Sequence, residues 1–256
     1  MKRTAIALFL AVTCLLVAQA AAFAASVMEK DVIVMGTEGT YPPFEYYDEN
    51  NQLTGFDIEV SEAVCRHMGK ELKIVDMAFD GLIPALLTGK IDMIAAGLAN
   101  TQERKKKVDF SDIYNVSWTS FIVKHDNDGM KSLDDLKGKS VGVQIGSTQD
   151  IYVSKLEIPM EIKRYQKNDD AVREVVLDRN DCIAINSFVG NSYIDNEKFK
   201  GYLKVAFRIM VNKPDEGIAI AMRKNDPEFL EAVNKAIREM EKSGELKRLK
   251  AKYRLD

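Results

Sequence analysis

Three short clusters of polar residues could recognise a small charged molecule. The first spans residues 36–44, where Glu38 offers a carboxylate and Tyr41 an aromatic face. The second ends in Arg104, whose guanidinium can hold a carboxylate through two parallel hydrogen bonds. The third, Gly-Ser-Thr-Gln at 146–149, can hold an anion with its hydroxyl and backbone N–H groups. Together these chemistries suit the recognition of a zwitterion.

Each cluster also has a purely structural interpretation. Residues 36–44 could form a plain turn with a solvated glutamate. Arg104 could be a surface side chain beside the three lysines that follow it. Residues 146–149 could be an ordinary helix cap, which is the favoured interpretation when that segment is taken alone. The residue types by themselves leave both interpretations open.

The sequence shows no signature of catalysis or of metal binding. It lacks a Gly-x-Ser-x-Gly elbow, a phosphate-binding loop with lysine and a His-Glu-x-x-His zinc helix. Cys65 and His67 stand two apart on a predicted helix, so they point to different faces. We therefore expect no catalytic residue, no metal and no cofactor. Cys65 and Cys182 lie in different halves of the chain, which favours two buried free thiols over a disulfide.

Short apolar runs alternate with helical patterns along the chain, which predicts an α/β fold with mainly parallel sheets. Most of the runs are apolar on both sides, as in strands that are covered on both faces. Each polar cluster follows such a run, and open α/β sheets bind ligands at the carboxyl ends of their strands. The predicted strands are 32–36, 72–75, 92–96, 140–144, 182–186 and 217–222.

Spacings of three and four residues predict the helices. One helix runs through Val60 to Met68 with Asp57 as its N-cap, and a shorter one covers 82–87. Near the C-terminus, Asp226 followed by Pro227 is typical of a helix start. The apolar stripe that follows stops at a glycine, and a last short helix comes after it.

Residues 1–24 read as a secretory signal peptide, with a basic start, an apolar run and small residues before a cut that precedes Ala25. Lipid attachment at Cys14 is disfavoured, because Thr13 rather than a small residue precedes it. Without the signal, 34 basic and 39 acidic residues leave a net charge of 34 − 39 = −5. This mild acidity argues against nucleic acid as a partner. No later apolar run approaches the ~20 residues that cross a bilayer, so we expect an exported, soluble protein.

In this order, the segments closely resemble the polar amino-acid family of periplasmic solute-binding proteins, from Val32 to Tyr253. The strings that carry the resemblance are Gly-Thr-Glu-Gly-Thr-Tyr-Pro-Pro-Phe (36–44), Gly-Phe-Asp-Ile-Glu (55–59), Phe-Asp-Gly-Leu-Ile-Pro-Ala-Leu (79–86), Gly-Lys-Ile-Asp (89–92), Thr-Gln-Glu-Arg (101–104), Asp-Phe-Ser-Asp (109–112), Leu-Lys-Gly-Lys-Ser-Val-Gly-Val (136–143) and Gly-Ser-Thr-Gln (146–149). Each string alone is weak, but eight in register are specific.

The resemblance implies the two-lobed, type II periplasmic-binding-protein fold, in which two crossing strands let the lobes close over a ligand like a flytrap. The first lobe would comprise 25–115 and 212–256, and the second 116–211. It also implies a monomeric periplasmic receptor that delivers an amino acid to the permease of an ABC importer in the inner membrane.

The resemblance further implies a role for each site residue. Arg104 would hold the α-carboxylate, helped by backbone N–H groups, and an aromatic pair would sandwich the side chain of the ligand. Glu38 would meet its polar tip, which favours a polar or basic amino acid. A backbone carbonyl would accept from the α-ammonium, and an amide of the second lobe would reach the side chain. The remaining residues in these roles are Ala99 and Thr148 (N–H groups), Tyr41 and Phe79 (aromatic pair), Gly97 (carbonyl) and Gln149 (amide).

One departure from the family concerns Asn186, where relatives usually place an aspartate against the α-ammonium. A neutral amide makes that contact roughly half as strong. Ala99 also lacks the hydroxyl that relatives often have there. A ligand without a free α-amine therefore stays open, although Glu38 and backbone carbonyls could supply enough acceptors.

Two other classes of function compete with a transport receptor. The fold also supports a dehydratase of the cyclohexadienyl type, but Asn186 removes the obvious acid and leaves only Glu38. A sensory ectodomain is disfavoured because the sequence shows no membrane helix or signalling module beside the binding lobes. We expect the protein not to be an enzyme.

Overall fold

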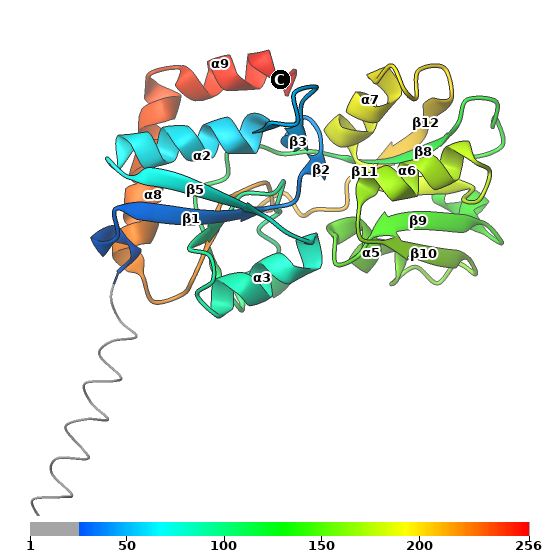
Figure 1. Ribbon diagram of the computed structural model, residues 1–256. Helices are drawn as coiled ribbons and strands as arrows, with labels where there is room; N and C mark the ends of the chain where they lie inside the picture. Colours follow the sequence, from blue (N-terminus) through cyan, green and yellow to red (C-terminus); the bar gives the residue numbers. More distant parts are fainter. Residues whose placement is uncertain (1–25, 256) are drawn as a thin grey trace, which may run out of the picture.

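Two α/β lobes lie side by side in the computed structural model, which describes residues 26–255 (Figure 1). Each lobe is built on its own five-stranded sheet. The predicted signal peptide, 1–24, lies outside the described residues. The two-lobed α/β architecture expected from the sequence is confirmed.

The first lobe has a sheet with the strand order β5-β1-β6-β13-β7. Alternate side chains of β1 face opposite layers: Ile33 and Met35 pack with α2 and α8, whereas Val34 packs on the side of α3. Figure 1 shows α2 and α3 on opposite faces of this sheet. The elements are η1 (Val27–Glu29), β1 (Val32–Thr37), α2 (Phe56–His67), β5 (Glu71–Asp76), α3 (Phe79–Leu87), β6 (Met93–Ile94), α4 (Gln102–Lys105), β7 (Asp109–Phe110), β13 (Ala221–Met222), α8 (Pro227–Lys242) and α9 (Glu245–Lys252). A small sheet of β2 (Thr40–Tyr41), β3 (Glu45–Tyr47) and β4 (Leu53–Thr54) adjoins it.

The second lobe repeats the plan with the strand order β10-β9-β11-β8-β12. Val172 and Val189, from α6 and α7, belong to a core on one face, and Val153 of α5 to a core on the other. The elements are β8 (Thr119–Lys124), η2 (Leu133–Leu136), β9 (Ser140–Gln144), α5 (Thr148–Val153), β10 (Glu161–Tyr165), α6 (Asn168–Val176), β11 (Cys182–Asn186), α7 (Ser187–Asp195) and β12 (Leu203–Ile209).

Both sheets are mixed, so the prediction of mainly parallel sheets is wrong for half of the pairings. β1 is parallel to β5 and β6, and β9 is parallel to β10 and β11. The remaining ladders, which contain β7 and β13 in one lobe and β8 and β12 in the other, are antiparallel. These four strands flank the segments that cross between the lobes. Parallel neighbours along the chain need a crossover connection, usually a helix. These strands are entered from or leave to the other lobe, so no crossover helix joins them and they pair antiparallel.

Two segments, 111–118 and 210–220, cross between the sheets and run side by side. The amide N–H of Ile218 donates to the carbonyl of Asn115 at 2.7 Å, and Ile218 in turn accepts from the N–H of Tyr114 at 3.0 Å. A Cβ atom on Gly217 would lie 2.8 Å from the Asn115 carbonyl oxygen, so a glycine is needed for this close approach. The lobe boundaries predicted at 115/116 and 211/212 fall within these segments and stay predictions.

The helix starts show one correct and one wrong prediction. Asp226 caps α8 by accepting the N–H of Phe229 at 3.2 Å, as expected. Asp57 does not cap α2, which begins at Phe56 after Gly55. Its carboxylate instead accepts the N–H of Gly97 at 2.7 Å and so holds the loop that contains Gly97. The prediction was wrong because Asp57 is the second residue of α2 and lies in its first turn, two residues after the cap position at Gly55.

Cys65 and Cys182 are free and buried, as the sequence predicts: Cys65 is 1 % exposed and Cys182 is fully buried. Within residues 26–255, no helix combines the length and apolar character needed to span a membrane. The same part of the chain contains no group of three His, Cys, Asp or Glu side chains placed to hold a metal ion.

Asp226 also ties the start of the described chain to α8. Its two oxygens accept the hydroxyl of Ser26 and the N–H of Val27, each at 2.7 Å, besides the α8 cap. We expect Asp226→Ala to lower the free energy of unfolding by about 1–3 kcal/mol, because a cap and further hydrogen bonds are lost together. Urea unfolding of the variant checks this. Asp126→Ala, at an exposed site, is the matched control, and an equal stability of the two variants would contradict the assignment.

Candidate functional site

The three polar clusters meet at the boundary between the lobes. Each follows the carboxyl end of a parallel strand, which is where sheets of this class place ligands. Two hydrogen bonds join the lobes across the site. Gln144 Nε2 donates to Glu38 Oε2 at 2.9 Å, and Arg104 Nη2 donates to the carbonyl of Gly146 at 3.2 Å. The site is therefore closed, with residues of both lobes in contact.

Arg104 is a buried cation at one part of this site. It is 7 % exposed, and its Nη1 donates to the carbonyl of Ala99 at 2.8 Å. Its guanidinium carbon lies 5.6 Å from the centre of the Phe79 ring, close enough for a cation–π contact. Burial lowers the pKa of Arg104 to about 10, so the side chain stays charged at neutral pH. None of the ion pairs within residues 26–255 includes Arg104.

Glu38 is a buried carboxyl group on the same interlobe site. It is 3 % exposed and accepts from Thr40 Oγ1, at 2.8 and 3.0 Å, and from Gln144. Burial raises its pKa to about 6, although both hydrogen bonds act in the opposite direction. Among the ion pairs of the described chain, none contains Glu38. The site thus holds two buried charges of opposite sign, each without an ionic partner.

Tyr41 packs directly against the backbone of Gly97. Gly97 has φ +54°, and a Cβ atom there would lie 2.4 Å from Tyr41 Cε1. The N–H of Gly97 is held by Asp57, whose other oxygen accepts the hydroxyl of Tyr114 at 3.0 Å. Burial raises the pKa of Asp57 to about 7. Asp57 therefore links the loop under Tyr41 to the first crossing segment.

Asn186 forms the cap of α7. Its Oδ1 accepts the N–H groups of Phe188 and Val189, at 2.9 and 3.5 Å, and its Nδ2 donates to Ser117 Oγ at 2.6 Å. An amide oxygen has two lone pairs, and both are used here. The oxygen can therefore accept from a ligand only by giving up part of the cap.

Thr148 and Gln149 closely follow Gly146, whose carbonyl accepts from Arg104 of the first lobe. Gln149 is 8 % exposed and donates to Thr119 Oγ1 at 2.9 Å, and Thr148 donates to Gln149 Oε1 at 3.2 Å. The structure brings Phe79 against Arg104, so the expected sandwich of Phe79 and Tyr41 around a ligand stays a prediction. The ligand contacts of all nine residues are likewise predictions.

Sequence reasoning missed the residues that hold the two charges. Thr40 lies inside the first cluster, but its contact with Glu38 was not foreseen. Gln144 is the last residue of a predicted strand, and this position at the carboxyl end was the available signal. The Gly146 carbonyl, which accepts from Arg104, gives no signal because any residue could supply it.

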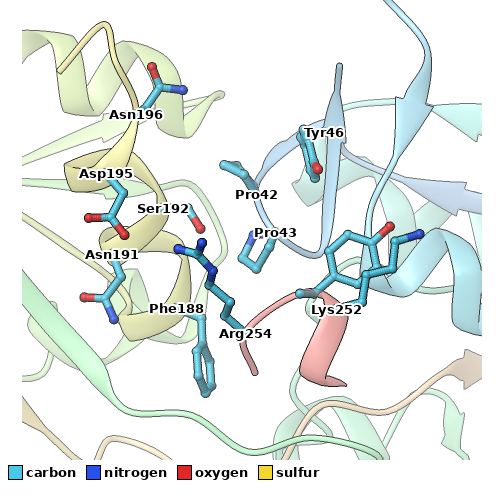
Figure 2. A pocket seen from close by; sticks show the side chains of 11 residues that line it. Pro42, Pro43, Tyr46, Phe188, Asn191, Ser192, Asp195, Asn196, Lys252 and Arg254 are labelled. Atoms are coloured by element: carbon cyan, nitrogen blue, oxygen red, sulfur yellow. The ribbon is translucent and has the colours of Figure 1, made fainter. Parts of the chain in front are cut away.

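A pocket of about 420 Å³ opens on the surface beside this site. Figure 2 shows it between α7, which carries Phe188, and the segment that carries Pro42 and Pro43, with Arg254 reaching in from the C-terminal end. None of the nine predicted site residues lines it. The pocket is therefore a feature of the lobe boundary, separate from the buried charges.

Two lobes that close over a buried pair of uncompensated charges define a ligand-binding protein of the flytrap class. Comparison with known families then identifies the family. The sequence model of the bacterial extracellular solute-binding proteins, family 3, matches residues 33–256, and the chain belongs to this family.

Similar proteins agree with this assignment. The arginine-binding extracellular protein ArtP of Bacillus subtilis (strain 168) is 40% identical over 228 residues, 88% of this chain and 86% of that protein. A solved ancestral arginine-binding protein bound to arginine is 38% identical with a TM-score of 0.83, and the match covers 88% of this chain and 98% of that one. An ancestral amino-acid-binding protein, a precursor of cyclohexadienyl dehydratase, is 35% identical with a TM-score of 0.80, covering 90% and 99%.

These findings confirm the family expected from the sequence. They also confirm the expected class of function, a receptor that binds an amino acid for import by an ABC transporter, and favour it over the enzyme alternative.

Gly97→Ala tests the contact between Tyr41 and the loop beneath it. Gly69 is the matched control, because it also has positive φ (+66°) but nothing within 4 Å of an added Cβ. We expect Gly69→Ala to destabilise by about 1 kcal/mol through backbone strain alone. Gly97→Ala should cost about 1–3 kcal/mol more, because the methyl group overlaps the Tyr41 ring. Equal losses in urea unfolding would mean that the ring moves away freely.

Proposed function

We propose that the protein binds a basic amino acid of the arginine type between its lobes and presents it to the membrane permease of an ABC importer. It acts as a monomer in the periplasm, after removal of residues 1–24, and carries out no reaction. The observation that carries the proposal is the pair of buried, unpartnered charges, Arg104 and Glu38. A ligand with a carboxylate and a cationic tip compensates both.

Arg104 has the donors for the α-carboxylate. A guanidinium has five N–H groups, and the bonds to Ala99 and Gly146 use two of them. The remaining donors can bind a carboxylate in the bidentate geometry that arginine favours. The ring of Phe79 supports the guanidinium from one side.

Glu38 favours a cationic side chain on the ligand. A buried carboxylate without a cation is costly, and a cation beside it favours the charged form. The aromatic face of Tyr41 offers a surface for the aliphatic part of the side chain. The names of the similar proteins, which include arginine binders, agree with this choice.

The α-ammonium would have fewer acceptors here than in a relative with an aspartate at position 186. Because the Asn186 oxygen already caps α7, the carbonyl of Gly97 becomes the main acceptor in this proposal. A ligand that lacks a free α-amine is the alternative that this arrangement leaves open.

A dehydratase is the second candidate function. It is favoured by the pKa of about 6 at Glu38, which suits a general acid, and by the similarity to a precursor of cyclohexadienyl dehydratase. Against it, Asn186 is not ionisable, so the site has no second acid in the position where relatives have one. Turnover of a cyclohexadienyl carboxylate by the purified protein would support the enzyme.

A thermal-shift panel of the common amino acids tests the proposed ligand. A ligand at ~100 times its dissociation constant should add about 2.7 kcal/mol of stability. We expect the largest shift with L-arginine and smaller shifts with lysine, histidine and glutamine. No shift with any basic amino acid would refute the proposed ligand class.

The affinity for L-arginine should depend on pH through Glu38. In the ligand-free site the carboxyl is largely protonated below its pKa of about 6, and a cationic ligand needs the ionised form. Binding therefore releases protons near pH 6, and the affinity rises as the pH rises. We expect about tenfold tighter binding at pH 7 than at pH 5, measured by calorimetry. The ligand's own groups do not titrate in this range.

Glu38→Gln is the control for this pH dependence. The amide keeps the size of the side chain but cannot ionise, so the variant should bind L-arginine more weakly and with nearly constant affinity between pH 5 and pH 7. A pH profile that is flat in the wild type, or unchanged in the variant, would contradict the pairing of Glu38 with a cation.

Asn186→Asp tests where the α-ammonium lies. One carboxylate oxygen can keep the α7 cap while the other faces the ammonium, so binding of a free amino acid should strengthen by about tenfold, or ~1.4 kcal/mol. A ligand without an α-amine should instead bind more weakly, because the new charge is buried without a partner. Calorimetry with L-arginine decides the sign. Asn191→Asp, exposed on the same helix, controls for net charge.

A further inference from the structure

Thr40 is a second point of contact between the lobes. It belongs to β2 of the first lobe and meets two helices of the second lobe. The hydroxyl of Tyr193, on α7, lies 2.9 Å from the Thr40 carbonyl oxygen. The N–H of Asn168, at the start of α6, lies 3.3 Å from Thr40 Oγ1. Figure 2 shows α7 facing the segment that follows Thr40, with Pro42 and Pro43, across the lobe boundary.

The Tyr193 hydroxyl faces two acceptors but has one proton. Besides the Thr40 carbonyl, it lies 2.5 Å from Oδ1 of Asp169, which belongs to the same lobe as Tyr193. A carbonyl and an ionised carboxylate can only accept, so the single proton serves one of them at a time. The carboxylate has the advantage because a charge-assisted hydrogen bond is about twice as strong as a neutral one.

We propose that Tyr193 sets the affinity of the receptor by exchanging its proton between two bonds, one within the second lobe to Asp169 and one across the lobes to Thr40. The bond to Thr40 exists only when the lobes are closed, so it stabilises the closed form without touching the ligand. The bond to Asp169 survives opening and competes with it. Where ligand affinity is concerned, the inference rests on the proposed function.

The surroundings of Tyr193 suit this role. The side chain is 4 % exposed, and its ring packs against Phe199 with centroids 5.9 Å apart. Burial raises the pKa of Tyr193 well above its usual value, and the nearby carboxyls of Asp169, Glu38 and Asp170 act in the same direction. The hydroxyl therefore keeps its proton and remains a donor.

The same contact reaches the ligand site through Thr40. The Thr40 hydroxyl donates to Glu38, the carboxyl group assigned to the ligand, while the Thr40 carbonyl faces Tyr193. Opening of the lobes removes the Tyr193 contact and the Gln144 bond to Glu38 together. The pair Tyr193 and Thr40 thus positions Glu38 in the closed form.

Two substitutions should act in opposite directions. Tyr193→Phe keeps the packed ring but removes the proton, so it should open the lobes and weaken binding by about three- to tenfold. In Asp169→Asn, the amide NH₂ can donate to the Tyr193 oxygen, and the tyrosine proton is then free for Thr40. This variant should favour the closed form and strengthen binding by a similar factor. Asp170→Asn, which makes the same charge change one residue away, is the control.

The experiment measures lobe closure without ligand and then affinity. Spin labels on cysteines introduced at the exposed positions Glu62 of α2 and Arg173 of α6 report the interlobe distance, since the native cysteines are buried. We expect longer distances in Tyr193→Phe and shorter ones in Asp169→Asn, with no change in Asp170→Asn. The double variant should behave like Tyr193→Phe, because the amide then has no tyrosine oxygen to donate to.

Calorimetry with L-arginine then measures the affinities. Opposite changes in Tyr193→Phe and Asp169→Asn support the exchange of the proton. Changes of the same sign, or unchanged interlobe distances in both variants, would overturn it. If the wild type does not bind L-arginine, the proposed function fails, but the distances in the ligand-free protein still decide on the role of Tyr193.

Discussion

The interlobe site depends on one buried carboxyl group, that of Glu38, which is 3 % exposed and has no ion-pair partner among residues 26–255. Glu38 lies where the two lobes meet, and its burial raises its pKa to about 6 because loss of water disfavours the charged form. Thr40 and Gln144 satisfy it only in part. Arg104 has the opposite charge and is also buried, and it donates hydrogen bonds to two carbonyls but forms no ion pair among the described residues. In the proposed function, a ligand that carries a carboxylate and a cation compensates both buried charges.

The position of these charges between the lobes links ligand binding to the closed form. Glu38 and Arg104 come from the first lobe, and their partners Gln144 and Gly146 come from the second. Within residues 26–255, only the segments 111–118 and 210–220 cross between the lobes, so the two halves can separate without unfolding either sheet. A ligand that compensates the charges binds the closed form better than the open one, which is the condition for ligand-driven closure.

The elements with regular patterns could be predicted from the sequence, whereas long-range partners could not. The apolar runs at 140–144 and 182–186 coincide with β9 and β11, and the stripe after Asp226 is α8. The sequence does not predict the antiparallel pairings: β7, β8 and β12 are not among the predicted strands, and the run at 217–222, which contains β13, carries no pattern that shows its direction. The sequence predicts Asp57 as a cap, because acids are common both at the cap position and in the first turn of a helix.

In the candidate site, too, single residues could be predicted from the sequence but their long-range partners could not. Glu38 closely follows a predicted strand and Arg104 lies in the polar segment after another, but only the resemblance to the family singles both out as site residues. Their neighbours are set by tertiary structure: Gln144 is 106 residues from Glu38, and Tyr193 is 153 residues from Thr40. Sequence spacing carries no information on such contacts. The cap at Asn186 is compatible with either an asparagine or an aspartate at this position, because Asn and Asp cap helices equally well.

The most direct test of the central claim compares L-arginine with L-citrulline by calorimetry. Citrulline has nearly the same shape, but a neutral ureido group replaces the guanidinium that Glu38 is proposed to meet. If Glu38 selects a cation, arginine should bind at least about 30-fold more tightly, or ~2 kcal/mol, at pH 7.5. Equal affinities for the two ligands would contradict the account.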